Sequence, residues 1–265
     1  MQNTQYPLKE QISKEAQKVQ IITTAIQRGG TGKTSTATAL AQAAAHRGYK
    51  ALAIDLDPQG NLSFAMGADM NRPGSFDLIT GNTAAAQLIQ QTAGGVSIIP
   101  ASWNLATLTT AQGSARRLQT ALQPLAGRFD LIVIDTPPTA GELQYNALQA
   151  STGLIIPLQA DTFCLQGLYQ IADTARQIQH SNPALTITGI LFTNHNDRAT
   201  VRKQLKKTIE AQAAEMGIPS LGAIRQGVAI QEAQTMQQSL YQYAPKSKPA
   251  ADYLQLLERL NLDKT

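Results

Sequence analysis

The chain has 265 residues, of which 43% are apolar and 15% charged, with 22 Lys and Arg residues against 18 Asp and Glu residues. This length supports a full hydrophobic core, and the apolar share is too high for a disordered chain. The formal charge of +4 does not by itself indicate a nucleic-acid-binding protein. Whether the chain could bind nucleic acid depends on where its basic residues lie. Cys164 is the only cysteine, which excludes an internal disulfide framework and a Cys-x-x-Cys metal or redox site.

The N-terminal 18 residues are polar and lack the apolar stretch of a secretory signal. No apolar run in the chain approaches the ~18 residues of a membrane span. A single thiol fits a reducing compartment. We therefore expect a cytoplasmic protein, with a short polar segment at residues 1–18 and a single domain at residues 19–265.

Short apolar runs alternate with helical patterns rich in Ala, Gln and Leu. The apolar runs predict strands at Gln20–Ile26, Ala51–Asp55, Val96–Pro100, Leu131–Asp135, Leu154–Leu158, Thr186–Thr193 and Leu221–Ile224. The other patterns predict helices at Lys33–Arg47, Ala115–Leu125, Leu143–Ala150, Leu165–His180, Thr200–Met216 and Ala250–Leu260. Because the strands are continuously apolar, they are typical of parallel strands covered on both faces. We predict an α/β fold of the P-loop NTPase type, a mostly parallel twisted sheet with helices on both faces, and irregular stretches at Gly67–Gly81 and Tyr243–Pro249.

The strongest motif lies between the first predicted strand and the first predicted helix, and reads QRGGTGKTS from Gln27 to Ser35. It fits the P-loop pattern G-x-x-x-x-G-K-[ST] only in part, because Gln27 stands at the first glycine. Glycines allow backbone N–H groups to close around phosphate oxygens, and a helix N-terminus adds the positive end of its dipole. Lys33 is predicted to reach the β- and γ-phosphates, and the Thr34 hydroxyl to bind Mg²⁺. The predicted phosphate-binding residues are Gly29, Gly30, Thr31, Gly32, Lys33, Thr34 and Ser35.

Two carboxylate-bearing segments follow later predicted strands. The segment IDLDPQGN begins at Ile54, and LIVIDTPP begins at Leu131. Ligands of open α/β sheets bind beyond the carboxyl ends of the strands, so we expect both segments to face the same crevice as the P-loop. Asp135 is predicted to hold the Mg²⁺ shell as a Walker-B-type acid, and Asp57 to orient the attacking water.

Together these segments resemble the ParA/MinD group of deviant Walker A ATPases, and within it the Soj-like ParA partition ATPases. The resemblance runs from about Val19 to Leu260 and includes QRGGTGKTS, IDLDPQGN, FDLIVIDTPP, IIPLQADTFCLQGL and APKSKPAADYLQLLERL. It implies binding of ATP and Mg²⁺, and a face-to-face homodimer with two nucleotides between the subunits. It also implies slow hydrolysis that a ParB-like centromere-binding protein stimulates.

The resemblance further implies roles for single residues. Asp57 matches the family's water-activating aspartate, and Asp55 matches its companion in the Mg²⁺ shell. Asn194 matches a position that contacts adenine, and Arg225 lies on a loop that approaches the base. Arg28 stands where the family has a signature lysine that reaches the partner subunit's nucleotide. Arg and Lys are not interchangeable; we predict that Arg28 still completes the dimer site, the alternative being that it faces solvent or a local acid.

A basic stretch without acidic residues falls in and just before the predicted helix at 200–216. Such a stripe suits sequence-independent contacts to a phosphate backbone, and ParA relatives bind DNA non-specifically through this part of the chain. The alternative is an ordinary solvated helix. Ala229 stands where a relative has a second arginine. The predicted DNA-binding residues are Arg198, Arg202, Lys203, Lys206 and Lys207, of which 198, 202 and 206 share one helical face, together with Lys246 and Lys248.

Other functions fit parts of the sequence. A ParA-like positioning ATPase for a protein or organelle cargo stays open, as does a nucleotide-binding protein without catalysis. Metal-cluster carriers that share the loop need paired cysteines, which the chain lacks. A MinD-like membrane-surface ATPase needs a C-terminal helix with a basic polar face. Here the polar face carries both signs of charge, so we expect the C-terminal helix to dock on the body of the protein and no membrane partner.

Overall fold

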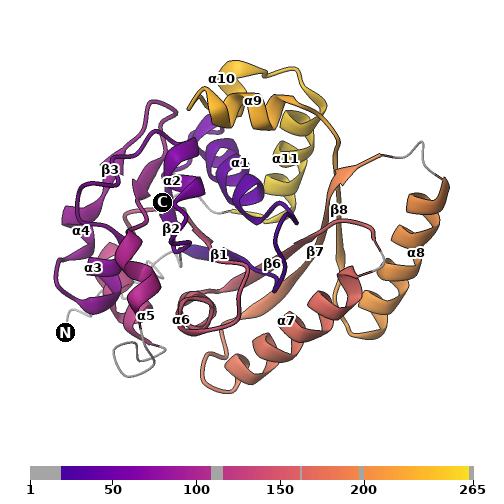
Figure 1. Cartoon of the computed structure of the whole chain (residues 1–265), viewed down its shortest axis with the longest axis horizontal. Coiled ribbons are helices and arrows are strands. Elements are labelled where there is room, and N and C mark those ends of the chain that lie inside the picture. Colours follow the sequence, from indigo (N-terminus) through magenta and orange to yellow (C-terminus); the bar gives the residue numbers. More distant parts are fainter. Residues whose placement is uncertain (1–18, 109–115, 162, 197–199, 263–265) are drawn as a thin grey trace, which may run out of the picture.

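A computed structural model of the chain describes residues 19–108, 116–161, 163–196 and 200–262. In these residues one eight-stranded sheet has the order β3-β4-β2-β5-β1-β6-β7-β8 (Figure 1). β3 is antiparallel to β4, and all other neighbours are parallel. The strands are β1 (Gln20–Thr24), β2 (Ala51–Asp55), β3 (Gln90–Gln91), β4 (Ser97–Ile99), β5 (Leu131–Asp135), β6 (Gly153–Leu158), β7 (Thr186–His195) and β8 (Ser220–Arg225). The predicted α/β class with a mostly parallel sheet is confirmed.

Helices cover both faces of the sheet (Figure 1). One face carries α1 (Lys33–His46), α2 (Asn61–Ala65), α9 (Ala229–Thr235), α10 (Leu240–Tyr243) and α11 (Lys248–Arg259). The other carries α3 (Ser75–Thr80), α4 (Ala85–Leu88), α5 (Arg117–Leu122), α6 (Glu142–Ala150), α7 (Cys164–Gln179) and α8 (Thr200–Glu215). Short 3-10 turns lie at Trp103–Thr107 and Gln123–Leu125. None of the helices described here is long and apolar enough to cross a membrane.

The central strands show why the sequence reads as continuous apolar runs. In β5, Leu131 and Val133 belong to the core on the α1 side, whereas Ile132 and Ile134 belong to the core on the α5–α6 side. All five β5 residues are buried. Successive side chains of a strand point to opposite faces, so a strand with two covered faces needs apolar residues at every position.

Helix α11 packs against α1 and leaves little of its apolar face open. Ser247 caps its start, because the hydroxyl accepts a hydrogen bond from the backbone N–H of Ala250. Tyr253 is 1% exposed, and its hydroxyl lies 3.3 Å from that of Thr36 on α1. Leu256 and Leu257 are buried in the same core. The apolar stripe of the last helix is therefore covered by the protein itself.

Several boundaries differ from the sequence-based expectations. The first strand ends at Thr24 instead of Ile26, because the chain turns into the P-loop, where the Arg28 N–H donates to the carbonyl of Ile26. Helix α3 lies within the stretch 67–81 that was expected to be irregular, so that expectation is wrong there. The elements not foreseen are α2, α3, α4, α9, α10, β3 and the first 3-10 turn, each of seven residues or fewer. Such short elements do not establish a helical or strand period in the sequence.

Candidate active site

A pocket of about 1160 Å³ opens at the carboxyl ends of the parallel strands. The connection after β1 leads to β2 in one half of the sheet, whereas the connection after β5 leads to β6 in the other half. Ligands of open α/β sheets bind at such a reversal of strand order. The lining comes from the P-loop, from the turns after β2, β5, β6 and β8, from the ends of β7 and β8, and from α2, α9 and α11. The predicted residues in this lining are Gly29, Gly30, Thr31, Gly32, Lys33, Thr34, Ser35, Asp57, Asn194 and Arg225.

The P-loop backbone has the form that phosphate binding needs. Gly30 and Gly32 have φ angles of 71° and 88°, which L side chains rarely adopt. A Cβ at Gly32 would also lie 3.1 Å from the methyl carbon of Thr193, whose hydroxyl donates to the carbonyl of Thr31 at 2.7 Å. Gly32 is the N-cap of α1 and supplies no side-chain cap. The first N–H groups of α1 therefore point into the pocket with the positive end of the helix dipole.

Lys33 is buried at the floor of this loop. The residue is 7% exposed, and its ammonium donates to the carbonyl of Arg28 at 2.7 Å. Burial lowers the pKa of Lys33, while the nearby carboxylates of Asp135 and Asp57 act in the opposite direction. The loop thus holds a cation close to two carboxylates and to the free N–H groups of α1.

Asp55 and Asp135 lie side by side at the ends of neighbouring strands, in register across β2 and β5. Both are 0% exposed. Burial raises the pKa of each carboxyl group, and in Asp135 the repulsion from Asp55 raises it further, against the opposing effects of Thr34 and Lys33. A buried carboxylate pair of this kind is unfavourable unless a cation lies beside it.

The two carboxylates differ in their hydrogen bonds. Asp55 accepts from the N–H and hydroxyl of Ser63, at 2.8 and 2.7 Å, and from the N–H of Asp57 at 3.0 Å. Asp135 uses Oδ1 to accept from the N–H of Thr136, whereas its buried Oδ2 has no hydrogen-bond partner among the described residues. Asp135 therefore has an oxygen to give to a ligand, and Asp55 holds the loop that carries Asp57. The metal role predicted for Asp55 stays a prediction.

This donor set fits Mg²⁺, which prefers oxygen ligands and keeps several waters beside phosphate oxygens. The unpartnered Oδ2 of Asp135 and the hydroxyl of Thr34 are the groups that would hold it. Asp57 is 7% exposed and reaches the pocket from the turn after β2, where its Oδ1 accepts from the N–H of Gln59 at 3.0 Å.

The far end of the pocket is built from the carboxyl ends of β7 and β8. Asn194 has a positive φ of 50°, is exposed, and makes no side-chain hydrogen bond among the described residues. Arg225 is fixed by Asp252 of α11, to which it donates from the backbone N–H at 2.8 Å, from Nε at 3.0 Å and from Nη2 at 2.6 Å. Asp252 is 8% exposed and was not foreseen from the sequence.

Comparisons with known proteins identify the family. A family model described as AAA domain matches residues 19–187. The chain is 32% identical to the chromosome-partitioning ATPase Soj of Thermus thermophilus, over 92% of this chain and 96% of that protein. It is 32% identical to the sporulation initiation inhibitor protein Soj of Bacillus subtilis, over 91% of this chain and 97% of that protein. The chain belongs to the ParA/Soj family of ATPases.

The likeness extends to solved structures. A crystal structure of cobyrinic acid a,c-diamide synthase from Mycobacterium smegmatis with bound ADP and magnesium superposes with a TM-score of 0.78 at 28% identity. The match covers 91% of this chain and 94% of that one. The resemblance inferred from the motifs is confirmed, and this ParA/Soj protein is an ATPase.

Arg28, the departure from the family's signature lysine, points to an acid of its own chain. Its Nη1 lies 2.5 Å from Oδ1 of Asp161 in the turn after β6, and the two side chains are 32% and 35% exposed. The hydrogen bond that Arg28 donates to Asp161 raises the pKa of Arg28. The residue does not line the pocket in this state. In the isolated ParA/Soj chain, Arg28 therefore pairs with a local acid, as in the alternative stated from the sequence. The role of Arg28 toward a second subunit stays a prediction.

The described basic residues that were predicted to bind DNA differ in their exposure. Arg202, Lys203 and Lys207 of α8 are exposed. Lys206 instead lies over the buried ring of Phe192, 5.4 Å from its centroid, and 3.9 Å from a carboxylate oxygen of Glu210. Lys206 is therefore partly covered by β7, and its contact with DNA stays a prediction.

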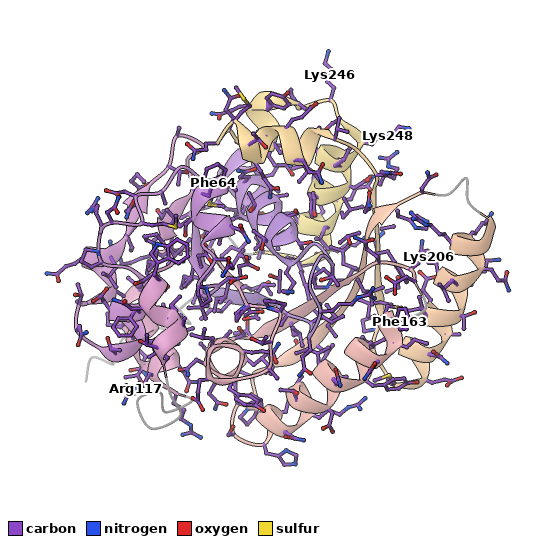
Figure 2. The ribbon with its side chains drawn as sticks, in the orientation of Figure 1. Phe64, Arg117, Phe163, Lys206, Lys246 and Lys248 are labelled. Atoms are coloured by element: carbon purple, nitrogen blue, oxygen red, sulfur yellow. The ribbon has the colours of Figure 1, made fainter. Side chains whose placement is uncertain are left out.

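The remaining predicted DNA contacts lie elsewhere. Lys246 and Lys248 are exposed at the junction of α10 and α11, and Figure 2 shows them at the top of the molecule, apart from Lys206 on α8. Arg198 lies outside the described residues. Two further residues belong to the family motifs but had no predicted role: Gln159, which donates to the carbonyl of Gly30 at 2.8 Å, and Asp161. Their signal is a polar run directly after the apolar β6 segment.

Proposed function

We propose that this ParA/Soj ATPase is a DNA-partition switch. In this proposal the chain binds ATP and Mg²⁺, pairs as a homodimer around two nucleotides, and binds double-stranded DNA without sequence preference. A ParB-like protein stimulates hydrolysis and releases the dimer. The observation that carries the proposal is a pocket lined by the P-loop, Lys33 and Asp57, with the buried carboxyl group of Asp135 close to Lys33.

The residues of the pocket have separable tasks. The N–H groups of the P-loop and the buried ammonium of Lys33 bind phosphate oxygens and offset their negative charge. Mg²⁺ would neutralise charge that develops on the phosphates during transfer of the terminal group. Asp57 accepts a hydrogen bond from the attacking water and orients it. Asn194 and Arg225 contact the base, with Arg225 fixed in place by Asp252.

The exposed cations of α8 carry the DNA-binding part of the proposal. Arg202, Lys203 and Lys207 form a small basic surface at the β8 edge of the sheet, and each Lys or Arg that neutralises a phosphate releases counterions. The names of the curated relatives, chromosome-partitioning ATPase among them, support DNA as the cargo. The buried apolar face of α11 speaks against the use of this helix on a membrane surface.

DNA binding is tested with a charge-matched pair of variants. Duplex DNA of arbitrary sequence is titrated with wild type, R202E/K207E and K50E/R72E, each with ATP, with ADP and without nucleotide. Lys50 and Arg72 are exposed cations away from α8, so the control has the same change in net charge. We expect ATP-dependent binding that R202E/K207E abolishes and K50E/R72E only weakens. Equal loss in both variants would contradict this surface.

The homodimer is tested by sedimentation with a non-hydrolysable ATP analogue. Wild type is expected to become dimeric with the analogue and to stay monomeric with ADP. R28A is expected to lose this dimerisation and to keep its affinity for the nucleotide, because Arg28 is not part of its own pocket lining. Equal dimerisation and equal hydrolysis of R28A and wild type would reject a role for Arg28 between subunits.

A further inference from the structure

The turn after β6 holds the P-loop at two points. Gln159 donates from Nε2 to the carbonyl of Gly30 at 2.8 Å. Asp161 binds the guanidinium of Arg28 through Oδ1 at 2.5 Å. The same Oδ1 accepts from the N–H of Phe163 at 3.0 Å, which orients the carboxylate toward the loop. Arg28, which stands at the position of the family's signature lysine, is therefore bound to an acid of its own chain.

The electrostatic environment of Asp161 supports an ion pair with Arg28. Burial acts to raise the pKa of Asp161, but the hydrogen bond and charge of Arg28 and the N–H of Phe163 outweigh it, so the pKa lies below its ordinary value. The carboxylate is ionised at neutral pH and attracts the guanidinium. Because about a third of each side chain is exposed, the pair is weak enough to open and exchange partners.

We propose that Asp161 is a positioning residue that competes, within the chain, for the Arg28 guanidinium that must reach the partner subunit's nucleotide. This inference rests on the dimer of the proposed function. A guanidinium held by a carboxylate cannot at the same time bind the phosphates across an interface, so the Arg28–Asp161 pair opens before the dimer closes. ATP binding alone does not require that opening, because Arg28 lies outside its own pocket.

Because a homodimer contains two Arg28–Asp161 pairs, the competition acts on both protomers. A partly exposed ion pair biases Arg28 toward the closed state by about fivefold. Only the open fraction, about one sixth, is competent, and dimerisation needs an open Arg28 in both protomers, so the dissociation constant of the dimer changes with the square of that fraction. Removal of the carboxylate is therefore expected to tighten the dimer by about 36-fold.

The test compares D161N, D161E, D173N, R28A and R28A/D161N by sedimentation with a non-hydrolysable ATP analogue, and measures nucleotide affinity of the monomers in parallel. The amide oxygen introduced by D161N still accepts from the Phe163 N–H, so the turn is preserved. Asp173 is an exposed acid of α7, and D173N is the control with the same loss of charge. D161S, which also keeps an acceptor, replaces D161N if that variant does not fold.

We expect D161N to tighten the dimer, D161E and D173N to dimerise as wild type does, and all three to bind nucleotide equally well. In the absence of Arg28 the carboxylate has nothing to compete for, so R28A/D161N should match R28A. If R28A loses the dimer but D161N leaves it unchanged, the competition is rejected and the proposed function stands. If R28A dimerises normally, the role of Arg28 itself is rejected. Tightening by D173N as well would assign the effect to net charge and overturn the proposal.

Discussion

At the scale of single residues, the site separates into groups that the sequence identifies locally and groups that only the fold brings together. The glycines, Lys33 and Thr34 of the P-loop are contiguous, so their motif and their strand–loop–helix setting can be recognised in one segment. Asp55 and Asp57 are also close in sequence, yet their hydrogen bonds give them different tasks. Asp55 fixes the turn, whereas Asp57 lines the pocket and is free to meet water.

Removal of the Asp57 carboxylate should separate hydrolysis from binding. We expect D57A to lower the turnover of ATP by about 100-fold or more, the usual contribution of a positioned general base. The affinity for ATP should stay close to that of wild type, since the phosphate cradle and Lys33 are unchanged. Phosphate release and nucleotide binding are measured on the same preparation, with K33A as the variant that loses binding. Normal turnover in D57A would remove Asp57 from the mechanism.

The buried Asp135 carboxyl group should lower the folding stability of the nucleotide-free protein. Its folded-state pKa is raised above the ordinary 3.8, so the folded state binds a proton that the unfolded state has released, and stability falls as the pH rises above that value. D135N carries no such charge, and its amide keeps an acceptor for the Thr136 N–H. We expect D135N to raise the stability of the nucleotide-free chain by about 1–3 kcal/mol at pH 8, and by less at pH 5.

Thermal unfolding without nucleotide measures this difference directly. A gain of about 1 kcal/mol corresponds to about 2–4 °C in the melting temperature of a chain of this size. D69N is the control, because Asp69 is exposed and its substitution removes the same charge. A gain that is equal at pH 5 and pH 8 would contradict titration of Asp135 as the cause.

Two residue pairs show why the rest of the site could not be predicted. Arg28 and Asp161 are 133 positions apart, and Arg225 and Asp252 are 27 apart on different elements. Neither spacing follows a helical or strand period, so nothing in the sequence links the partners. The motifs identified the cations as pocket or interface candidates, but the acids that hold them are defined only by the packing of β6 beside β1 and of α11 beside β8.

At the scale of elements, long periodic segments were predictable and short ones were not. The central strands need apolar residues on both faces, and helices such as α7 and α8 are 16 residues long, so their patterns are unmistakable. Helices α9 and α10 have seven and four residues and take their conformation from packing on α1 and α2. The orientation of α8 was also not predictable, because spacing shows which residues share a face but not which face meets the sheet.

That orientation predicts different roles for neighbouring lysines of α8. We expect R202A/K207A to make the dependence of DNA affinity on salt less steep by about 0.9 per lost phosphate contact, or about 3–4 for the four contacts of a dimer. K206A should leave the slope nearly unchanged and lower stability instead, because Lys206 covers Phe192 and pairs with Glu210. Affinities at several salt concentrations and a melting curve distinguish the two; a slope change in K206A equal to that in R202A/K207A would contradict the assigned orientation.

At the scale of the whole molecule, the pocket is supported from both halves of the sheet and from both ends of the described chain. Its lining begins at Gly29 in the P-loop and ends at Tyr253 on α11, and α11 packs on the helix that the P-loop opens. A ligand that binds there contacts early and late elements of the fold together. Its binding energy should therefore stabilise the fold as one cooperative unit.

Thermal unfolding with and without ligand therefore tests whether the pocket joins the early and late elements of the fold into one unit. A ligand at 100 times its dissociation constant stabilises the state that binds it by about 2.7 kcal/mol, which corresponds to a rise of about 5–10 °C in the melting temperature. We expect ATP with Mg²⁺ to shift a single calorimetric transition by that amount, and K33A to abolish the shift. ATP with a chelator should shift it less, since the Oδ2 of Asp135 then stays unpaired. Two transitions, of which only one moves with the nucleotide, would show that α11 and the P-loop unfold separately and that the pocket does not join them.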